Sequence, residues 1–423
     1  MAIASANPNA YVAAFAQDLA ERRREFERKL AAMCVRNAFQ YWAARCGLLL
    51  RWADVVSFSR QVLRDATLDG VVLSYAHNVA WLTNGARTFV NMAAEVGVGA
   101  IFVDQTRAVL LTNEIEGDRL LREEMRGLDD LITLHQDPWY GQPKALEVAQ
   151  RLAGSEQVAQ DTTHPIVEER LLSLRSTLSE HEMAIYRALG HDCGAIIGDV
   201  ARAVRPGVTE LEIAGQLAQR CWAKGIAPIV LLIAADERVD THRHPLPTLN
   251  TVKHKAMLVL CGRRAGFVAS VTRMVYVTTT EHHSIPGDLA ARHDAATYVD
   301  AVAITSSRPG VEAQAVFKAI QDAYAAKGFP GEWKLHHQGG CAGYKSREWI
   351  ATPEMRHKVA VNQAFAWNPS VTGTKSEDTV LLRQTPAGNT GYEVITATPG
   401  WPVIEHVVNG VSIQRPGILQ LSL

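Results

Sequence analysis

Two long apolar runs in the second half of the chain, separated by a short polar stretch, limit the possible fold more than any other feature. The runs are AMLVLCG (256–262) and FVASVTRMVYVT (267–278), and both have the length and composition of strands. We expect these two strands to meet at a hairpin whose tip carries Arg263 and Arg264. The sequence from Met257 to Thr278 contains no Asp or Glu, so these two strands supply no carboxylate.

Helix-like and strand-like segments surround these strands from about residue 169 to the end of the chain. Thr177 or Ser179 can cap a helix that Pro206–Gly207 ends, and Thr209 can cap a second helix that ends at Gly225. The other runs with clear strand or helix character are APIVLLIAAD (227–236), VEAQAVFKAIQDAYAAKG (311–328), QAFAWNPSV (363–371) and DTVLLRQ (378–384).

The first part of the chain divides into an extension and a small domain. Residues 1–57 are expected to form a helical extension, with helices at Tyr11–Met33 and Phe39–Ala53. Its ERRREFERKL segment intersperses Glu with Arg, which favours a solvated helix face over a nucleic-acid-binding arm. Residues 58–168 contain short strand-like runs such as VGVGAIFVD (96–104), and these predict a small α/β domain.

The composition excludes several classes of protein. Lys and Arg number 43 against 44 Asp and Glu, so no basic excess exists to bind a nucleic-acid backbone. Six cysteines without a CxxC pair argue against a disulfide framework or a cysteine zinc site, and favour reduced thiols. The sequence has neither a secretory leader nor about 18 consecutive apolar residues. We therefore expect a cytoplasmic protein without a membrane partner.

Four segments carry candidate chemistry. In order they are DERVDTHRHPLPT (236–248), LVLCGRRAGFVASVTRMVY (258–276), LHHQGGCAGYKSREW (335–349) and FAWNPSVTGTKSEDTVLL (365–382). With the entry helix LSEHEMAIYR, they resemble the creatinase, prolidase and aminopeptidase P superfamily over about residues 58–405. The resemblance implies an α+β chain: the helical extension, a small α/β domain over 58–168 and a pita-bread domain over 169–423.

The peptidases of that superfamily hold two metal ions with two Asp, one His and two Glu. Transferred one position at a time, these ligands fall on Leu260, Ser270, Gly340, Asn368 and Glu377. A one-residue slip in the alignment would not supply either missing Asp, because the strands there contain no acid. Of these five residues, only Glu377 is a strong ligand for such metals. The resemblance therefore implies a relative that lacks most of the metal ligands, and we expect no metal and no other cofactor.

The same resemblance implies three catalytic residues. His244 falls where the superfamily places a His beside the substrate, and creatinase, which needs no metal, transfers protons with a His. An imidazole suits that work because its ordinary pKa is near 6.5. His336 matches a substrate-contacting His, and Glu377 is expected to orient the His or to bind a cationic group of the substrate.

Other positions are expected to bind substrate. Arg273 and Arg347 can hold a carboxylate or an oxyanion, because a guanidinium stays charged and offers two parallel donors. Arg87, from the small domain, is expected to reach a neighbouring subunit's site or else to form an ordinary loop salt bridge. The remaining substrate-binding candidates lie in the site segments: His337, Glu348 and Asn368.

The leading hypothesis is a metal-independent, creatinase-like hydrolase that cleaves a C–N bond of a small polar substrate bearing a carboxylate. Three alternatives stay open: a metal-dependent Xaa-Pro aminopeptidase or dipeptidase, a catalytically inactive pita-bread protein that binds a partner, and a lyase or isomerase using the same His. A homodimer is expected, because relatives with the small domain commonly pair.

Overall fold

A computed structural model describes the protein except residues 1–7, 34–67, 142, 279–282, 385–387 and 423. The chain divides into two compact units, residues 1–175 and 176–423. This boundary lies seven residues beyond the predicted one at 168/169, because helix α7 (Pro165–Arg175) belongs to the first unit. There Arg175 and Glu168 both bond the side chain of Asn78. The predicted helix at Phe39–Ala53 falls outside the described residues.

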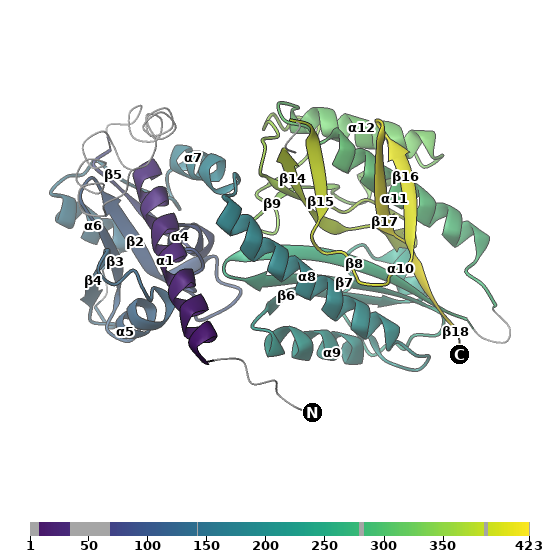
Figure 1. The fold of residues 1–423 in the computed structure, drawn as a ribbon, viewed down its shortest axis with the longest axis horizontal. Coiled ribbons are helices and arrows are strands. Elements are labelled where there is room, and N and C mark those ends of the chain that lie inside the picture. The colour runs from purple at the N-terminus through teal and green to yellow at the C-terminus, as the bar shows by residue number, and fades with distance from the viewer. Residues whose placement is uncertain (1–7, 34–67, 142, 279–282, 385–387, 423) are drawn as a thin grey trace. The chain divides into compact units, whose positions relative to one another are not determined.

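The first unit is a small α/β domain, as predicted. Its five-stranded sheet has the order β4-β3-β2-β1-β5, and β2 has the range that the sequence indicated (Figure 1). The sheet packs its apolar face against helix α6 through residues such as Val72 and Val148. The strands and helices after α1 are β1 (Gly70–Tyr75), α4 (Ala76–Thr83), β2 (Val96–Asp104), β3 (Ala108–Asn113), α5 (Gly117–Arg119), the π-helix η1 (Leu120–Glu124), β4 (Ile132–Asp137), α6 (Ala145–Ala153) and β5 (Val158–Gln160).

Helix α1 (Pro8–Met33) confirms the first predicted helix of the extension and packs on the first unit. Phe26 and Leu30 are buried on its inner side, and the Lys29 ammonium donates to the Trp81 carbonyl at 2.6 Å. The described part of the extension is therefore an integral layer of the first unit.

The second unit begins with two helices that cover an antiparallel hairpin. Ser179 and Thr209 cap α8 (Glu180–Arg202) and α9 (Glu210–Ala223) through complete capping boxes. These helices pack on the sheet β18-β8-β7-β6, which contains the predicted hairpin. Its strands are β6 (Ala227–Ala235), β7 (Lys255–Arg264), β8 (Phe267–Thr278) and β18 (Ile418–Ser422).

The tip of that hairpin differs from the predicted one. Ala265 and Gly266 form the two-residue turn, both with positive φ, whereas Arg263 and Arg264 are the last residues of β7. Two positive φ values suit a turn that matches the twist of the flanking strands. This turn sets the register of the hairpin and pairs Cys261 with Ser270.

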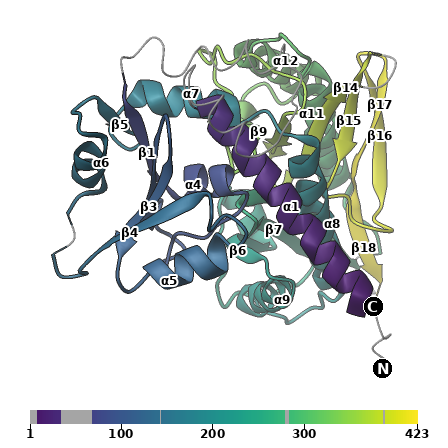
Figure 2. The ribbon, with the colours of Figure 1, turned by 60° about the vertical axis from the view of Figure 1, so that its left-hand side comes forward.

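A second sheet, of order β10-β9-β11-β14-β15, lies under α11 and α12, beside the hairpin β16–β17 (Figures 1 and 2). Strand β8 meets β14 where Thr272 N–H donates to the Glu377 carbonyl at 3.1 Å. The elements of this part are α10 (Glu237–Thr241), α11 (Gly287–Ser306), α12 (Ala313–Ala326), the 3₁₀ turn η2 (Glu332–Lys334), β9 (Gly339–Ala342), β10 (Trp349–Ile350), β11 (Ala364–Trp367), β12 (Ser370–Val371), β13 (Thr374–Lys375), β14 (Asp378–Gln384), β15 (Thr390–Val394), β16 (Val403–Val408) and β17 (Val411–Pro416).

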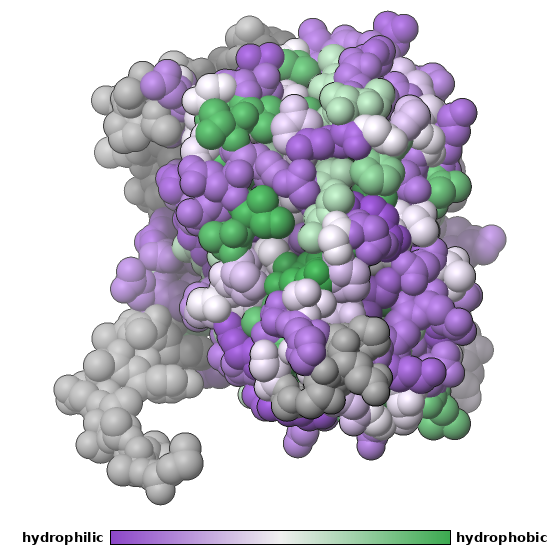
Figure 3. All heavy atoms as spheres, turned by 90° about the vertical axis from the view of Figure 1, so that its right-hand side faces the viewer, coloured by the Kyte–Doolittle hydropathy of each residue, from purple (hydrophilic) through white to green (hydrophobic). Residues whose placement is uncertain are grey.

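The surface of the molecule mixes polar and apolar side chains. On the face drawn in Figure 3, hydrophobic residues lie in separate groups among hydrophilic ones. Within the described ranges, no helix combines the length and the apolar character needed to cross a membrane.

Candidate active site

His244 lies in the loop between α10 and β7 and is held there by its two neighbours. The Arg243 guanidinium donates to Glu332 at 2.6 Å, which fixes the loop to η2. The Pro245 carbonyl accepts from Ile233 N–H on β6 at 3.1 Å. Because these two anchors flank it, the imidazole of His244 has a defined place although it is exposed to solvent.

His336 and His337 lie between η2 and β9, where the backbone passes close to neighbouring strands. After Gln338 come two glycines with no room for a side chain. A Cβ on Gly339 would lie 2.2 Å from the Ala366 carbonyl oxygen, and one on Gly340 would lie 2.1 Å from that of Trp349. The sheet therefore excludes any side chain at Gly340, the position that matches the metal-binding His of the peptidases.

The three imidazoles form a cluster. The Nε2 atoms of His244 and His336, 92 positions apart in sequence, are separated by 3.1 Å, and the Nδ1 atom of His336 lies 3.4 Å from Ser370 Oγ. The ring centre of His337 lies 4.7 Å from that of His336. One ligand nitrogen from each His lies within 4.8 Å of the others, so the cluster is a donor set that can hold one metal ion.

Loss of contact with water keeps these rings neutral. Burial lowers the pKa of His336 to about 2 and that of His337 to about 4, and partial desolvation also lowers the pKa of the more exposed His244. The positive charges of Lys375 and Arg347 act in the same direction, Lys375 on His336 and both cations on His337. At neutral pH the rings are therefore uncharged, and each has one bare ring nitrogen that can accept a hydrogen bond.

Glu377 precedes β14 and is bound on both carboxylate oxygens. Oε2 accepts from the Thr272 hydroxyl at 2.7 Å and pairs with the Lys375 ammonium at 2.8 Å, while Oε1 accepts from the Arg347 guanidinium at 2.9 Å. Burial opposes ionisation here, but the charges of Lys375 and Arg347 hold the pKa of Glu377 well below its usual range. Glu377 is thus an ionised carboxylate whose oxygens are already engaged by protein donors.

Strands β7 and β8 turn uncharged side chains toward this ion pair. Ser270 Oγ contacts both Cys261 Sγ and an Arg347 guanidinium nitrogen, each at 3.3 Å. Burial raises the pKa of Cys261, so its sulfur is a thiol and not a thiolate nucleophile. Leu260, onto which the first Asp was transferred, pairs with Val271 on the opposite face of the sheet, so Cys261 takes that place.

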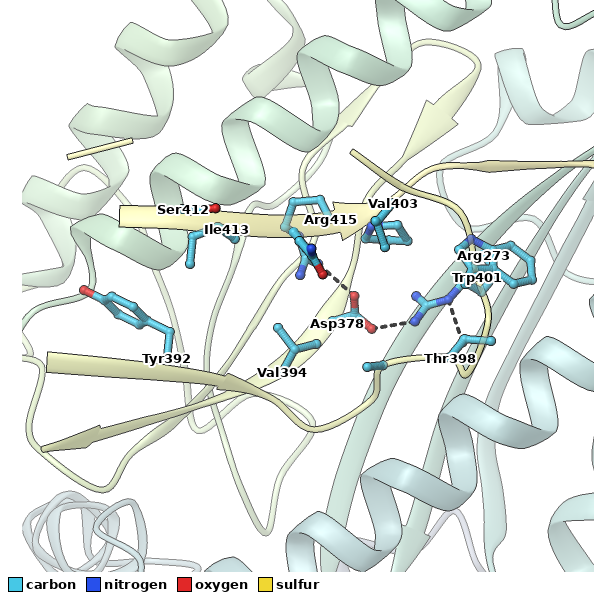
Figure 4. A pocket seen from close by; sticks show the side chains of 13 residues that line it. Arg273, Asp378, Tyr392, Val394, Thr398, Trp401, Val403, Ser412, Ile413 and Arg415 are labelled. Carbon is cyan, nitrogen blue, oxygen red and sulfur yellow. Dashed lines mark hydrogen bonds and ion pairs between the residues drawn. The ribbon is translucent and has the colours of Figure 1, made fainter. Parts of the chain in front are cut away.

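Arg273 is not brought to the cluster. It follows Thr272 on β8 and therefore points to the other face, where it is fully buried and donates to Asp378 at 2.9 Å and to Thr398 at 2.8 Å. Arg415 pairs with the second oxygen of Asp378, and these groups line a cavity of about 390 Å³ (Figure 4). Arg273 therefore holds β14 in place through Asp378, on the face of the strand opposite the histidine cluster.

Three further candidates, Glu348, Asn368 and Arg87, make contacts outside the histidine cluster. Glu348 accepts from the N–H groups of Tyr344 and Lys345 and so closes a tight turn. Asn368 is buried next to β9, where its backbone N–H donates to the Gln338 carbonyl at 3.1 Å. Arg87, in the first unit, pairs with Glu124 at 2.7 Å, which is the salt bridge that the sequence left as the alternative.

Sequence reasoning missed Lys375 and Ser370, which face each other across β12 and β13. The signal for Lys375 was its spacing, because in an extended segment a residue two positions before Glu377 shares its side of the strand. No comparable signal marks Ser370, whose contact with His336 depends on how the two strands fold back.

Comparison with known proteins agrees with this architecture. Residues 184–384 match the model of metallopeptidase family M24. The second unit is an M24 pita-bread domain. The match supports the superfamily that the motifs resemble, and the M24 members of that superfamily are hydrolases acting on peptide C–N bonds. No curated protein matches the chain at a significant level.

Solved structures share the fold of this chain at low identity. Dipeptidase PepE from Mycobacterium ulcerans is 16% identical with a TM-score of 0.67, covering 95% of this chain and 99% of its own. Xaa-Pro dipeptidase from Bacillus anthracis is 16% identical with a TM-score of 0.64, covering 86% and 98%. The N-terminal domain of FACT complex subunit SPT16 from chickpea, Cicer arietinum, is 10% identical with a TM-score of 0.57, covering 88% and 96%.

Proposed function

We propose that the protein is a metal-independent hydrolase that cleaves a C–N bond of a small, carboxylate-bearing substrate, with His244 as the acid–base residue. One observation carries the proposal. Glu377, the one carboxylate at the positions transferred from the peptidases, is engaged by Thr272, Arg347 and Lys375 and is not free to bind a cation.

The other residues of the site do not fit a pair of metal ions either. Two such ions need bridging carboxylates to offset their charge. The corresponding side chains here are the thiol of Cys261, the hydroxyl of Ser270 and the amide of Asn368, and Gly340 has no space for an imidazole. Lys375 and Arg347 already pair with Glu377, the one acid among these ligand positions, and their positive charges would repel a metal ion there.

The histidine pair supports a defined role for each ring. Among the described residues, the hydrogen bond of His244 is made by Nε2 to His336, which leaves His244 Nδ1 for water or substrate. His336 stays neutral because it is buried. Its bare Nε2 therefore accepts a hydrogen bond from His244 Nε2–H, and His336 does not itself take up a proton from water. In this arrangement the free lone pair of His244 lies on Nδ1.

The reaction then follows general acid–base chemistry. His244 Nδ1 takes a proton from water as the water oxygen bonds to the substrate carbon, and then returns that proton to the leaving nitrogen as the C–N bond breaks. His336 is a positioning residue that fixes the tautomer, and Ser370 supports it from Nδ1. Arg347 is placed to bind the negative oxygen or carboxylate of the substrate.

A second candidate, a metal-dependent peptidase, has one observation in its favour. The nitrogens of His244, His336 and His337 come close enough to share a single ion. In that case the metal would occupy the lone pair that the first proposal assigns to the base.

Metal analysis combined with turnover distinguishes the two candidates. Protein freed of metal by chelation and dialysis, with content checked by plasma mass spectrometry, is assayed on a panel of N-acyl amino acids, lactams and amidines that carry a carboxylate. Undiminished turnover without metal is expected. Stoichiometric manganese, cobalt or zinc in active protein, together with loss of turnover on chelation, would replace the first candidate with the second. Absence of turnover with and without metal would leave a binding protein.

A further inference from the structure

The charges at the base of the candidate site do not balance. The side chains of Lys375, Arg347 and Glu377 are 5%, 9% and 3% exposed, and they form one ion-paired group. Two cations share one carboxylate there, so the group carries one net positive charge. A buried charge without a counter-charge is unfavourable, so such a group favours a partner of opposite sign.

In the described part of the chain, the neighbouring acids Asp378 and Glu348 have other partners. Asp378 points to the other face of β14, where Arg273 and Arg415 bind its two oxygens. Glu348 accepts from the backbone of its own turn, through Tyr344 N–H. The histidines add no negative charge.

Polar atoms with unused hydrogen-bonding capacity accompany this charge. Within the described part of the chain, Arg347 Nε is buried and has no hydrogen-bond partner, and the same holds for His337 Nδ1. A guanidinium N–H is always a donor, so Arg347 retains a donor for a ligand oxygen or a water. The net charge and the unused donor point to the same kind of ligand.

We infer that Lys375 and Arg347 form a carboxylate-binding site in which Lys375 makes the site selective for anions. The inference rests on the proposed function, because the ligand is taken to be the substrate. It also locates the carboxylate of that substrate next to Glu377, where a guanidinium or ammonium group would not bind. The expectation that Glu377 binds a cationic group is therefore replaced, since Glu377 is already neutralised.

A carboxylate of the bound substrate and the oxyanion of a reaction intermediate are both negatively charged oxygen ligands. Binding measurements distinguish which of the two the site binds. The intermediate exists only during turnover, whereas a stable carboxylate binds without it. The first probe is therefore malonate, an unreactive dianion, with N-acetylglycine as a monoanion and methylguanidinium as a cation of similar size.

Isothermal titration calorimetry on the full chain at low salt tests the inference. Malonate should bind the wild type, and methylguanidinium should not. Lys375→Met should weaken malonate binding about tenfold or more, because it removes the net charge, whereas Lys375→Arg should stay within about threefold. Lys318→Met is the matched control, since Lys318 is an exposed lysine that pairs with Asp322 on α12.

Each result has a defined reading. Equal binding of malonate and methylguanidinium, or unchanged malonate binding in Lys375→Met, would overturn the inference. Should Lys375→Met fail to fold by circular dichroism, the contrast between anion and cation on the wild type, and the behaviour of Lys375→Arg, still decide it. Malonate binding without hydrolysis of any compound of the panel would contradict the proposed function but not this inference. Hydrolysis without selectivity for anions would contradict this inference but not the proposed function.

Discussion

At the scale of single residues, the proposed function depends on His244 more than on any other side chain. Substituting glutamine for His244 removes the proton acceptor and keeps a polar side chain of similar size. Turnover is expected to fall by about 10²–10⁴-fold, the usual contribution of a positioned general base. Malonate affinity should not change, because Lys375 and Arg347 remain.

His242 provides the control for that substitution. It lies two positions earlier on the same loop, is exposed, and contacts the Thr241 hydroxyl at 2.8 Å. His242→Gln should retain wild-type turnover. Equal losses in both variants would mean that the loop, and not the His244 ring, is what the reaction requires.

The tautomer of His244 can be measured without any substrate. Nitrogen-15 NMR of the histidine side chains distinguishes a protonated ring nitrogen from a bare one. The pairing with His336 predicts a proton on Nε2 and a bare Nδ1 in His244 at neutral pH. In His336→Phe, which has no acceptor, the His244 signal should shift toward a mixture of tautomers; a signal from Nδ1–H in the wild type would contradict the assigned base.

The sequence could predict part of this site, and the physical reasons for its failures are specific. The resemblance placed His244 and His336 in one site, and they lie 3.1 Å apart. It could not tell Arg273 from Thr272, because neighbouring strand residues face opposite sides and the facing side depends on register. Register here follows from the turn at Ala265–Gly266, so a correct turn assignment would have put Cys261 opposite Ser270.

At the scale of elements, α8 crosses a backbone segment so closely that glycine is required. A Cβ on Gly194 would lie 2.5 Å from the Thr396 carbonyl oxygen, and rigid backbone cannot move aside cheaply. Gly194→Ala should therefore lower the free energy of unfolding by about 1–3 kcal/mol, the usual cost of overpacking, despite the better helix propensity of alanine. Urea denaturation followed by tryptophan fluorescence measures the change.

Gly215 in α9 is the matched control. It is exposed, and a Cβ there would meet nothing within 4 Å. Gly215→Ala should raise the free energy of unfolding by about 0.5–1 kcal/mol, because alanine loses less backbone entropy in a helix. If both alanine variants stabilise the protein, then α8 does not approach Thr396 as closely as described.

Helix α11 carries a pH-dependent contribution to stability through His293. This ring is fully buried, lies 2.6 Å from the Thr374 hydroxyl and 2.9 Å from the Pro416 carbonyl, and faces the charges of Asp294 and His406. Burial lowers the pKa of His293 to about 4. In the unfolded chain His293 binds a proton near pH 6.5, whereas in the folded chain it stays neutral until about pH 4. Its contribution to the free energy of unfolding is therefore fully present above pH 6.5 and is lost as the pH falls toward 4.

The expected size follows from the shift in pKa. Each pH unit between those values costs about 1.4 kcal/mol, which gives roughly 3 kcal/mol over the range. His293→Gln removes this titration, so the difference in unfolding free energy between wild type and variant should shrink by that amount from pH 7 to pH 4. A difference that does not vary with pH would contradict the assigned pKa.

Elements were predictable where local signals were complete. Strands β2 and β14 have the ranges read from the sequence, and the capping residues Ser179 and Thr209 mark the starts of α8 and α9. Helix α11 was missed because it is buried on most sides, so its sequence lacks the alternation of polar and apolar faces that reveals a helix. The last strand, β18, pairs with β8, which lies about 140 positions earlier, and local patterns do not encode such pairing.

At the scale of the whole molecule, the boundary between units lies seven residues beyond the predicted one because hydrogen bonds to the Asn78 side chain hold α7 on the first unit. Asn78, Glu168 and Arg175 join α7 to the first unit, and contacts between residues about 90 positions apart have no local signature. Composition and periodicity alone therefore do not predict the exact residue at which the two units meet.

The division into units leads to a final prediction. Every residue proposed here for the base, its positioning partner and the carboxylate site belongs to residues 176–423, a unit with its own core around Leu232, Val259 and Met274. A chain beginning at Ser176 should therefore fold cooperatively and bind malonate within about threefold of the full chain, as calorimetry would measure. Because Lys375 carries the selectivity, Lys375→Met should weaken malonate binding in the short chain by the same factor as in the full chain. A short chain that folds by circular dichroism but no longer binds malonate would mean that the first unit contributes groups to the carboxylate site.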